Sequence, residues 1–322
     1  MENKKKIIGM LVAVEIEAVL QRYGERLEDV SESGYSIKRL EADDYIMYIL
    51  KSGAGEIAAA AGTQFLITRY SCGFILNFGV VGGLTEEMSL AKTCVIESVV
   101  HYDFDTSTID SCEKARYLEY PSIYIPAPGE LVDMAIKAEP GLKRVICASA
   151  DKFVDEPDKK RALHLEYNAD ICEMEAAGIL LTCNRNGVPC LMIKAVSDAI
   201  EGGCEEFAAQ VDRSAAICLD AAHRIIESMK GGLYRRYLLK QAKHPNNGFC
   251  VKGHAAYRYS MAMGVMLLYS FWPALTEDIT LCTLKEDAMA LSVITSFAAP
   301  KRLLPSLSKS SALSAILSAW SG

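Results

Sequence analysis

The stretch PCLMIKAVSD, from Pro189 to Asp198, is mostly apolar, with one charged residue, Lys194, inside it and two polar residues at its end. Its apolar side chains are consecutive and do not alternate with polar ones, a pattern that indicates a strand buried on both faces of a sheet. We therefore predict a strand from Cys190 to Val196 that delivers Ser197 and Asp198 at its carboxyl end. In α/β enzymes this end of a strand carries the chemistry.

Runs of the same kind recur before residue 229 and alternate with helix-like stretches. The alternation predicts an α/β fold, with a largely parallel or mixed sheet between helical layers. The other predicted strands are KIIGMLVAV (6–14), YIMYILK (45–51), GFILNFGV (73–80), TCVIESVV (93–100) and RVICASA (144–150). The predicted helices are IEAVLQRYG (16–24), GEIAAAAGTQFLITRY (55–70), PGELVDMAIKAE (128–139), CEMEAAGILLTCNRNG (172–187) and CEEFAAQVDRSAAICLDAAHRIIESMK (204–230).

Composition limits the class of protein. The chain has 322 residues, 51% of them hydrophobic, which supports a full core. A formal net charge of −7 argues against a general nucleic-acid binder. The eleven cysteines form no CxxC pair, and MENKKKIIGMLVAV lacks the long apolar core and cleavage site of a secretory signal. We expect a reduced, cytoplasmic compartment.

Charge divides the chain near Gly231 and Gly232. Residues 230–322 contain 11 Lys and Arg against 4 Asp and Glu, a net charge of +7, whereas residues 1–229 carry −14. We predict a catalytic domain over 1–229 and a basic, apolar-rich extension over 230–322. The run SMAMGVMLLYSFWPAL, Ser260 to Leu275, has 16 residues, fewer than the about 20 that cross a bilayer. We expect a buried helix or a surface element there, and contact with a membrane surface is left open.

Two glycine-rich stretches follow predicted strands. SGAGEIAAAAG contains Gly53-x-Gly55-x-x-Ala58, the local form of a dinucleotide fingerprint. The acidic residue that such a site needs about 20 positions later is missing, since FILNFG offers Asn77. We therefore expect a tight turn that lets a helix pack closely. In NFGVVGGL, Asn77 to Leu84, glycines allow either a sharp turn or the close approach of a ligand.

The stretch HYDFD places His101, Asp103 and Asp105 at alternating positions, which on a strand would face one side. That spacing suits a metal site, but no second cluster of His or Cys supports one. Polar residues at a strand end or at a subunit contact are the commoner case. We expect no metal here.

The acidic residues near PCLMIKAVSD have two interpretations each. Asp198 either carries chemistry at a strand end or caps the following helix. Glu173 and Glu175 are the only charges of ICEMEAAGILLTC, and a helix from about Ala176 would end at Gly187. The two glutamates then complement the dipole of that helix or face a cleft.

Taken together, these motifs resemble those of one family. VAVEIEAVL, SGAGEIAAA, NFGVVGGL, VVHYDFDTS, SADKFV, CEMEAAGI and IKAVSDAIEGG occur in this order over about Lys4 to Met229. They are similar to the motifs of 5′-methylthioadenosine/S-adenosylhomocysteine nucleosidases of the purine-nucleoside phosphorylase superfamily. The resemblance implies a three-layer fold with a central mixed sheet flanked by helices.

By that resemblance the reaction is hydrolysis of the N-glycosidic bond of an adenine nucleoside, without a cofactor. Asp198 resembles the residue that protonates N7 of the leaving adenine, and Glu17 resembles the carboxylate that activates the attacking water. Each such proton transfer contributes roughly 10²–10⁴ in rate. Glu175 resembles the residue that accepts hydrogen bonds from the ribose hydroxyls, with Met174 and Glu173 beside the sugar.

The resemblance also implies contacts to the base and to the 5′ group. Phe153 is expected to stack on adenine, and the backbone of Val154 to bond its edge, beside Ser197 and Asp198. An apolar pocket for the 5′-alkylthio group would be completed by the partner subunit of a homodimer. Its implied residues are Val14, Phe207 and Ile109.

Two positions depart from the family pattern near the attacking water. Val80 stands where many members have Ser, and Lys194 where many have Arg. The expected substrates are 5′-methylthioadenosine, S-adenosylhomocysteine and 5′-deoxyadenosine. The alternatives are a phosphate-dependent purine nucleoside phosphorylase and a relative that binds nucleosides without turnover. No obvious set of arginines resembles the phosphate site of a phosphorylase, which favours hydrolysis.

Overall fold

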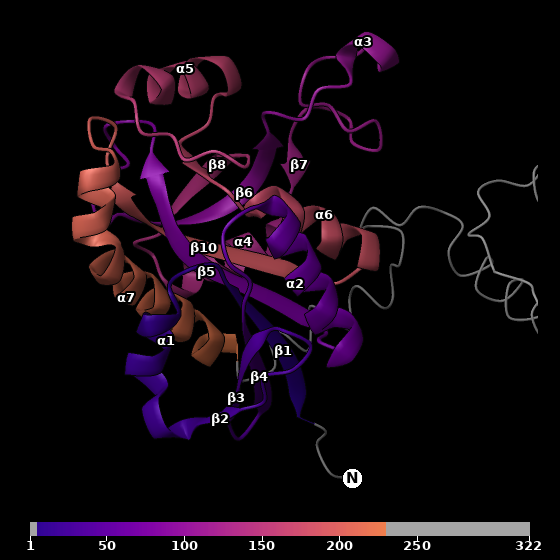
Figure 1. Ribbon diagram of the computed structural model, residues 1–322, viewed down its shortest axis with the longest axis vertical. Coiled ribbons are helices and arrows are strands. Elements are labelled where there is room, and N and C mark those ends of the chain that lie inside the picture. The colour runs from indigo at the N-terminus through magenta and orange to yellow at the C-terminus, as the bar shows by residue number, and fades with distance from the viewer. Residues whose placement is uncertain (1–4, 230–322) are drawn as a thin grey trace, which may run out of the picture. The chain divides into compact units, whose positions relative to one another are not determined.

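The computed structural model describes residues 5–229 of the chain, and a mixed β-sheet forms the centre of this part (Figure 1). The strands are β1 (Lys6–Val12), β2 (Leu27–Asp29), β3 (Ser36–Glu41), β4 (Tyr45–Lys51), β5 (Phe74–Gly83), β6 (Thr93–His101), β7 (Ile125–Pro126), β8 (Lys143–Ser149), β9 (Ile171–Glu173) and β10 (Cys190–Asp198). The helices are α1 (Ile16–Tyr23), α2 (Glu56–Arg69), α3 (Ser107–Asp110), α4 (Gly129–Ala138), α5 (Pro157–Tyr167), α6 (Ala176–Asn186) and α7 (Cys204–Met229), with a 3-10 turn η1 (Gly24–Arg26).

One part of the sheet closes into a ring of strands, and the other part extends from this ring and ends at the edge strand β2. Its strand order is β10-β6-β8-β9-β5-β1-β4-β3-β2, and β7 pairs with β6. Strand β10 also pairs with β5, in parallel, so β5, β10, β6, β8 and β9 close into a ring. The short strand β9 is antiparallel to the last residues of β5 and parallel to β8. The predicted α/β class with a mixed central sheet is confirmed.

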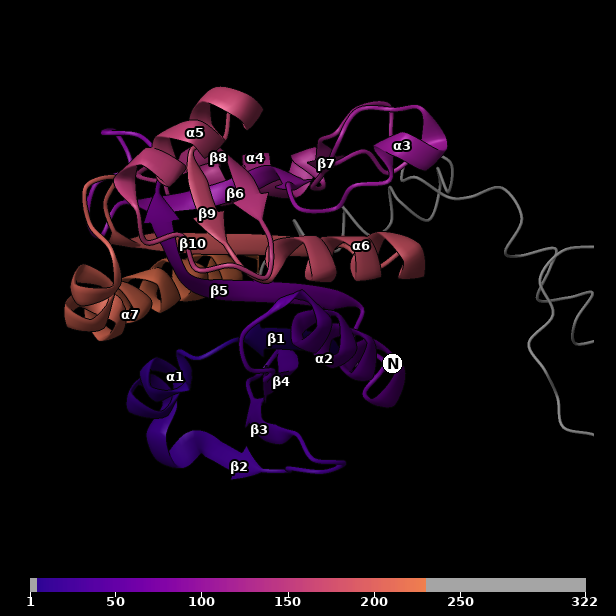
Figure 2. The same cartoon turned by 45° about the horizontal axis from the view of Figure 1, so that its top comes forward.

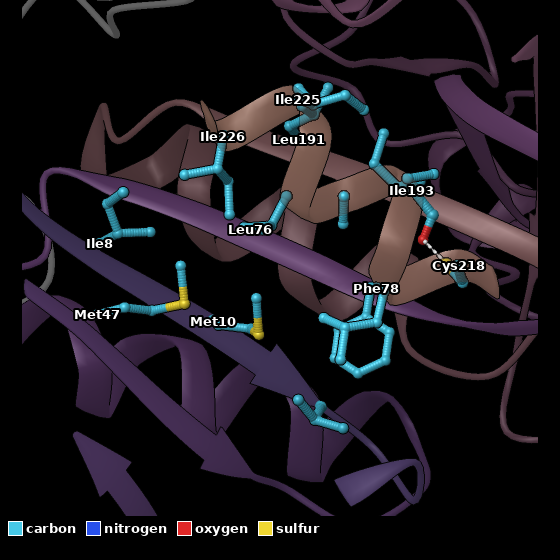
Figure 3. Close-up of a cluster of buried hydrophobic side chains, with 14 of the residues drawn as sticks. Ile8, Met10, Met47, Leu76, Phe78, Leu191, Ile193, Cys218, Ile225 and Ile226 are labelled. Carbon is cyan, nitrogen blue, oxygen red and sulfur yellow. Dashed lines mark hydrogen bonds between the residues drawn. The ribbon is translucent and has the colours of Figure 1, made fainter. Parts of the chain in front are cut away.

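Helices cover both faces of the sheet because its central strands are apolar on both sides. Every residue of β10 is buried, as its non-alternating, mostly apolar pattern predicted, and this includes Lys194 in the middle of the strand. Met10 and Leu76 join the cluster packed under α1, α4 and α7, whereas their neighbours Leu11 and Ile75 join the cluster under α2 and α6. Figure 3 shows the first cluster, where Ile226 of α7 lies near β5. Figure 2 shows α7 and α6 against different parts of the sheet.

The predicted boundaries of α6 are confirmed. The helix starts at Ala176 and ends before Gly187, whose φ of 63° is in the left-handed region that favours glycine. Gly55, with φ of 104°, directly precedes α2, which confirms the predicted tight turn.

Several elements were not predicted. Strands β2, β3, β7 and β9 and the helices α3 and α5 are short or polar. Helix α5 has the sequence PDKKRALHLEY and buries only Lys160, Leu163 and Tyr167. Its apolar pattern is therefore too weak to be found by hydrophobic periodicity. It covers a third cluster, which includes Leu84, Val154 and Leu163.

The predictions for residues 230–322, including the domain boundary and the run Ser260 to Leu275, concern residues outside the described part. Within the described residues, no helix combines the length and the apolar character needed to span a membrane.

Helices α2 and α6 cross closely at Gly178. A Cβ atom at Gly178 would collide with the backbone carbonyl oxygen of Glu56. We predict that Gly178→Ala lowers the free energy of unfolding by about 1–3 kcal/mol, as overpacking does. Gly129→Ala is the control, because a Cβ there meets nothing within 4 Å. Urea unfolding measures both variants, and equal stabilities would contradict the close crossing.

Candidate active site

A buried carboxylate follows the carboxyl end of β1. Glu15 precedes α1, and its two carboxylate oxygens accept the backbone N–H groups of Val80, at 2.8 Å, and Val14, at 2.9 Å. It is 7% exposed. A Cβ on Gly79 would lie 2.9 Å from Glu15 Oε1, so the glycine provides the space for this carboxylate. The residue sits against the middle of β5.

The glycines of NFGVVGGL therefore serve close approach, not turns, because β5 runs through all of them. Gly82 leaves space for the carboxyl group of Asp198, as Gly79 leaves space for that of Glu15. A Cβ on Gly82 would lie 3.1 Å from Asp198 Oδ2. Two acidic side chains are thus placed against the same strand.

Glu173, at the end of β9, and Lys194, in the middle of β10, form a buried ion pair with 3.2 Å between Lys194 Nζ and Glu173 Oε2. Glu173 also accepts the hydroxyl of Ser149 at 2.6 Å and the N–H of Ala176 at 2.9 Å. Burial opposes its ionisation, but Lys194 and these hydrogen bonds hold its pKa below the ordinary value. Burial likewise disfavours the Lys194 cation, yet Glu173, Glu175 and Glu15 raise its pKa. The pair is charged.

Glu175 precedes α6 and projects into the same region. Its Oε1 atom accepts the backbone N–H of Gly55 at 2.9 Å, which ties it to the turn before α2. Burial, and then the charge of Glu173, raise the pKa of Glu175 to about 7. Among the described residues its carboxylate accepts one hydrogen bond, and a carboxylate has about four acceptor sites, so sites remain for further donors.

Glu56 is a second glutamate with a raised pKa. Burial and the charge of Glu173 raise it to about 8. Glu56 contacts the hydroxyl of Ser149 and accepts the N–H of Gly178. Ser149 has one hydroxyl proton, but its oxygen is in hydrogen-bond contact with both Glu56 and Glu173. One contact therefore uses a carboxyl proton, and the pKa values assign it to Glu56.

Asp198 ends β10, and each of its oxygens has one donor. Ser197 Oγ donates to Oδ1 at 2.9 Å, and Lys160 Nζ of α5 donates to Oδ2 at 2.6 Å. Burial raises the pKa of Asp198, and Lys160 opposes this effect. Helix α7 starts only at Cys204, so the alternative that Asp198 caps this helix is wrong.

Two of the predicted site residues are phenylalanines that contact each other. The rings of Phe153 and Phe207 meet edge to face, with centroids 5.4 Å apart. Phe153 is 46% exposed, and the neighbouring Val154 is buried. The two predicted contact residues for the base and for the 5′ group are therefore adjacent. Met174, between Glu173 and Glu175, is partly buried.

Other predicted residues lie on the surface of this chain. Ile109 of α3 is 83% exposed, and Val14 is 45% exposed. Glu17, the residue assigned to water activation, is exposed in the first turn of α1. The helix buries Ile16 and Val19, which turns Glu17 outward. The structure thus brings Glu15, and not Glu17, to β5.

The residues of HYDFD do not converge on one point. His101 Nε2 is 3.1 Å from Asp103 Oδ1, and His101 Nδ1 is 2.8 Å from the hydroxyl of Tyr117. Asp105 instead accepts the N–H of Ser107 at 3.0 Å. In the part of the chain that is described, no group of three His, Cys, Asp or Glu side chains is arranged to hold a metal.

Sequence reasoning missed three site residues: Glu15, Glu56 and Lys160. Glu15 had a signal, because it follows a predicted strand as directly as Asp198 does. Glu56 directly follows Gly55 as the first residue of α2, where an acidic residue is common in any helix. Lys160 lies on the unpredicted helix α5, among charged residues that gave it no distinction.

Glu56 makes the stability of the fold depend on pH. A carboxyl group with a raised pKa in the folded state stabilises fully below its ordinary pKa, and this contribution is lost as pH rises through about 8. We predict that Glu56→Gln, which mimics the protonated acid, is more stable than the unmodified chain at pH 8.5 by roughly 1–2 kcal/mol. At pH 5 the two should be similar.

Urea midpoints at both pH values measure this difference. The exposed Glu25 provides the matched control, since Glu25→Gln should not change the pH dependence. A Glu56→Gln variant that loses as much stability between pH 5 and 8.5 as the unmodified chain would contradict the assignment of the proton.

Comparisons with known proteins agree with the motifs. A family model described as the phosphorylase superfamily matches residues 7–230. A 5′-methylthioadenosine/S-adenosylhomocysteine nucleosidase from Shewanella oneidensis is 31% identical over 157 residues, which are 47% of this chain and 65% of the relative. The match thus spans slightly less than two thirds of that relative. An aminodeoxyfutalosine nucleosidase from Helicobacter pylori is 27% identical over 197 residues, which are 59% of this chain and 85% of the relative.

Solved structures have the same fold. The 5′-methylthioadenosine/S-adenosylhomocysteine nucleosidase of Helicobacter pylori superimposes with a TM-score of 0.66 at 25% identity, covering 70% of this chain and 99% of that structure. The matched family model includes every described element from β1 to α7. The chain therefore belongs to the phosphorylase superfamily, as its motifs predicted.

Proposed function

We propose that this chain hydrolyses the N-glycosidic bond of adenine nucleosides, releasing adenine and a 5-substituted ribose. The candidate substrates are 5′-methylthioadenosine, S-adenosylhomocysteine and 5′-deoxyadenosine. The observation that carries the proposal is the placement of two buried acids, Asp198 and Glu15, against the same strand β5. The names of the curated nucleosidase relatives support the same reaction.

The two acids suit opposite tasks. Asp198 is buried with a raised pKa, which favours the protonated form that a general acid needs. It would give its proton to N7 of adenine, so that the base leaves neutral as the C1′–N9 bond breaks. Glu15 is held by two backbone N–H groups and would accept a proton from the water that attacks C1′. We therefore assign water activation to Glu15 in place of Glu17.

The ribose would lie between these acids and contact Glu175. Its carboxylate has free acceptor sites for the ribose hydroxyls, and a negative charge there favours a cation-like sugar. Two hydroxyl donors would also favour the ionised form of Glu175, whose pKa is raised to about 7 in their absence. Met174 would line the sugar, and Glu173 would hold Lys194 and the start of α6.

The base and the 5′ group would occupy the aromatic side of the site. Phe153 would stack on adenine, with the backbone of Val154 and the side chain of Ser197 at its edge. Phe207 touches Phe153 and would separate the base from the 5′ group. The pocket for the alkylthio group would include Phe207, Val14 and, from the partner of a homodimer, Ile109.

Charge favours water over phosphate as the nucleophile. The Lys194 cation near Gly79 is paired with Glu173, and Glu15 is an acidic group at the same place. A phosphate dianion there would meet a carboxylate without a free cation among these residues. Val80 contributes its backbone N–H to Glu15, so the reaction does not need a serine side chain at this position.

The biological setting is also part of the proposal. A nucleosidase of this kind would act in methionine salvage, in the cytoplasm, as a homodimer without a cofactor or a nucleic-acid partner. Every cysteine among the described residues is a free thiol, which is compatible with a reducing compartment. Residues 230–322 would form an extension beyond the catalytic domain of residues 1–229.

The first test is release of free adenine from 5′-methylthioadenosine in phosphate-free buffer, followed by chromatography. We expect release by the unmodified chain and a loss of about 10²–10⁴-fold in Asp198→Asn. S-adenosylhomocysteine, 5′-deoxyadenosine and aminodeoxyfutalosine complete the panel and rank the 5′ groups. Release that requires phosphate would indicate a phosphorylase, and calorimetric binding without release would indicate a non-catalytic relative.

The second test separates the two glutamates of VEIEAVL. Glu15→Gln should lower kcat by about 10²-fold or more while nucleoside binding stays measurable, because the amide keeps the shape but cannot accept the proton. Glu17→Gln is the matched control two residues away, and its kcat should stay within about twofold. The opposite result would restore Glu17 as the residue that activates water.

A further inference from the structure

Helix α5 carries a fully buried lysine that the reaction outlined above does not use. Lys160 is 0% exposed, whereas its neighbours Lys159 and Arg161 are on the surface. It lies on the inner face of the helix with Leu163 and Tyr167. A buried ammonium group is costly unless it is paired and fully hydrogen-bonded, so its surroundings indicate what it does.

All three protons of the Lys160 ammonium group have acceptors. They are Asp198 Oδ2 at 2.6 Å, the carbonyl oxygen of Ala199 at 2.7 Å and that of Gly202 at 2.8 Å. Two acceptors thus belong to the loop between β10 and α7, and the third is the proposed acid. One side chain of α5 therefore fixes both the loop and the carboxyl group that precedes it.

The other groups around Asp198 do not replace this cation. Ser197 donates to the second carboxylate oxygen, Cys172 of β9 is a buried thiol, and the β5 residue paired with Asp198 is Gly82, which has no side chain. Glu206 of α7 is acidic and accepts the N–H of Ala199. Lys160 is the one cation in contact with Asp198 among the described residues.

Proton transfer from Asp198 strengthens its electrostatic interaction with Lys160. Asp198 gives a proton to N7 of adenine, the electrons of the C1′–N9 bond move into the base, and Asp198 becomes a carboxylate. Water adds hydroxide to C1′ and gives its proton to Glu15. Exchange with solvent then returns a proton to Asp198 and removes one from Glu15. The carboxylate formed on Asp198 is stabilised by the adjacent ammonium group, whereas the neutral acid is stabilised less.

We propose that Lys160 is a positioning residue of this reaction: it holds Asp198 and the loop 199–203 in place and stabilises the carboxylate that Asp198 becomes after proton transfer. The inference rests on the proposed function for its catalytic consequence. The ionisation of Asp198 can be measured without turnover.

The experiment compares Lys160→Met with the unmodified chain and with Lys159→Met, a control on the exposed side of the same helix. The pKa of Asp198 is followed by NMR of carboxyl-labelled aspartate, and Asp198→Asn identifies the signal. We expect Lys160→Met to raise this pKa by about one unit or more, because burial then acts unopposed. Lys159→Met should leave it unchanged.

The pH profile of kcat/KM gives the second readout. The general acid must be protonated, so the high-pH limb should move upward in Lys160→Met by the same amount as the NMR value. The plateau of kcat should fall about tenfold, because a weaker acid transfers its proton less readily. If Lys160 only held the structure together, Lys160→Met would change activity or stability but would shift neither the pKa of Asp198 nor the high-pH limb of the kcat/KM profile.

The outcomes separate the two proposals. Adenine release by the unmodified chain with no change of the Asp198 pKa in Lys160→Met would overturn the role of Lys160 alone. Absence of turnover in the unmodified chain would overturn the proposed function, while the NMR titration would still decide whether Lys160 controls Asp198. Lys160→Gln, which lacks the charge but keeps donors for the loop, is measured if Lys160→Met does not fold, and the same rise is expected.

Discussion

The buried ion pair between Glu173 and Lys194 is the interaction on which the rest of the site depends. Lys194 comes from the fully buried strand β10, and Glu173 ends the short strand β9. The charged Glu173 then organises what surrounds it, because it accepts the N–H groups at the start of α6 and the hydroxyl of Ser149. Removing either partner would leave an uncompensated charge in the interior, which costs several kcal/mol. The start of α6, with Glu175 directly before it, is therefore hydrogen-bonded to the acidic member of this pair.

Acidic side chains exceed cations in the interior, and the fold accommodates the excess in three ways. Glu173 is paired with the buried Lys194, and Asp198, whose pKa burial raises, contacts the buried Lys160. One glutamate, Glu56, keeps its proton because burial and its charged neighbour raise its pKa to about 8. Glu15 is held by backbone N–H groups. Glu173 and Glu56 therefore differ in ionisation although they are neighbours, and a site that must both donate and accept protons needs such differences.

Much of the fold could be predicted because burial on both faces leaves a clear pattern. The apolar runs that became β1, β4, β5, β6, β8 and β10 are nearly continuous, and the helices α1, α2, α4, α6 and α7 lie between them in sequence. Prediction failed where burial is slight. Helix α5 buries only three of its residues, so its one important side chain, Lys160, looks in the sequence like any surface lysine. The short strand β9 has no pattern of its own and exists because β5 and β8 pair with it.

The sequence by itself determined the class of fold, the superfamily and the strand end that carries Asp198, because these depend on local apolar patterns and on ordered motifs. It did not determine which glutamate of VEIEAVL faces the interior. Glu15 and Glu17 are two residues apart and chemically identical, and only the orientation of α1 over the sheet buries the first and exposes the second. The pairing of Lys160 with Asp198, 38 residues apart, likewise required the tertiary structure. The ionisation of a side chain depends on the charges that lie near it in the folded structure, and these cannot be read from positions along the sequence.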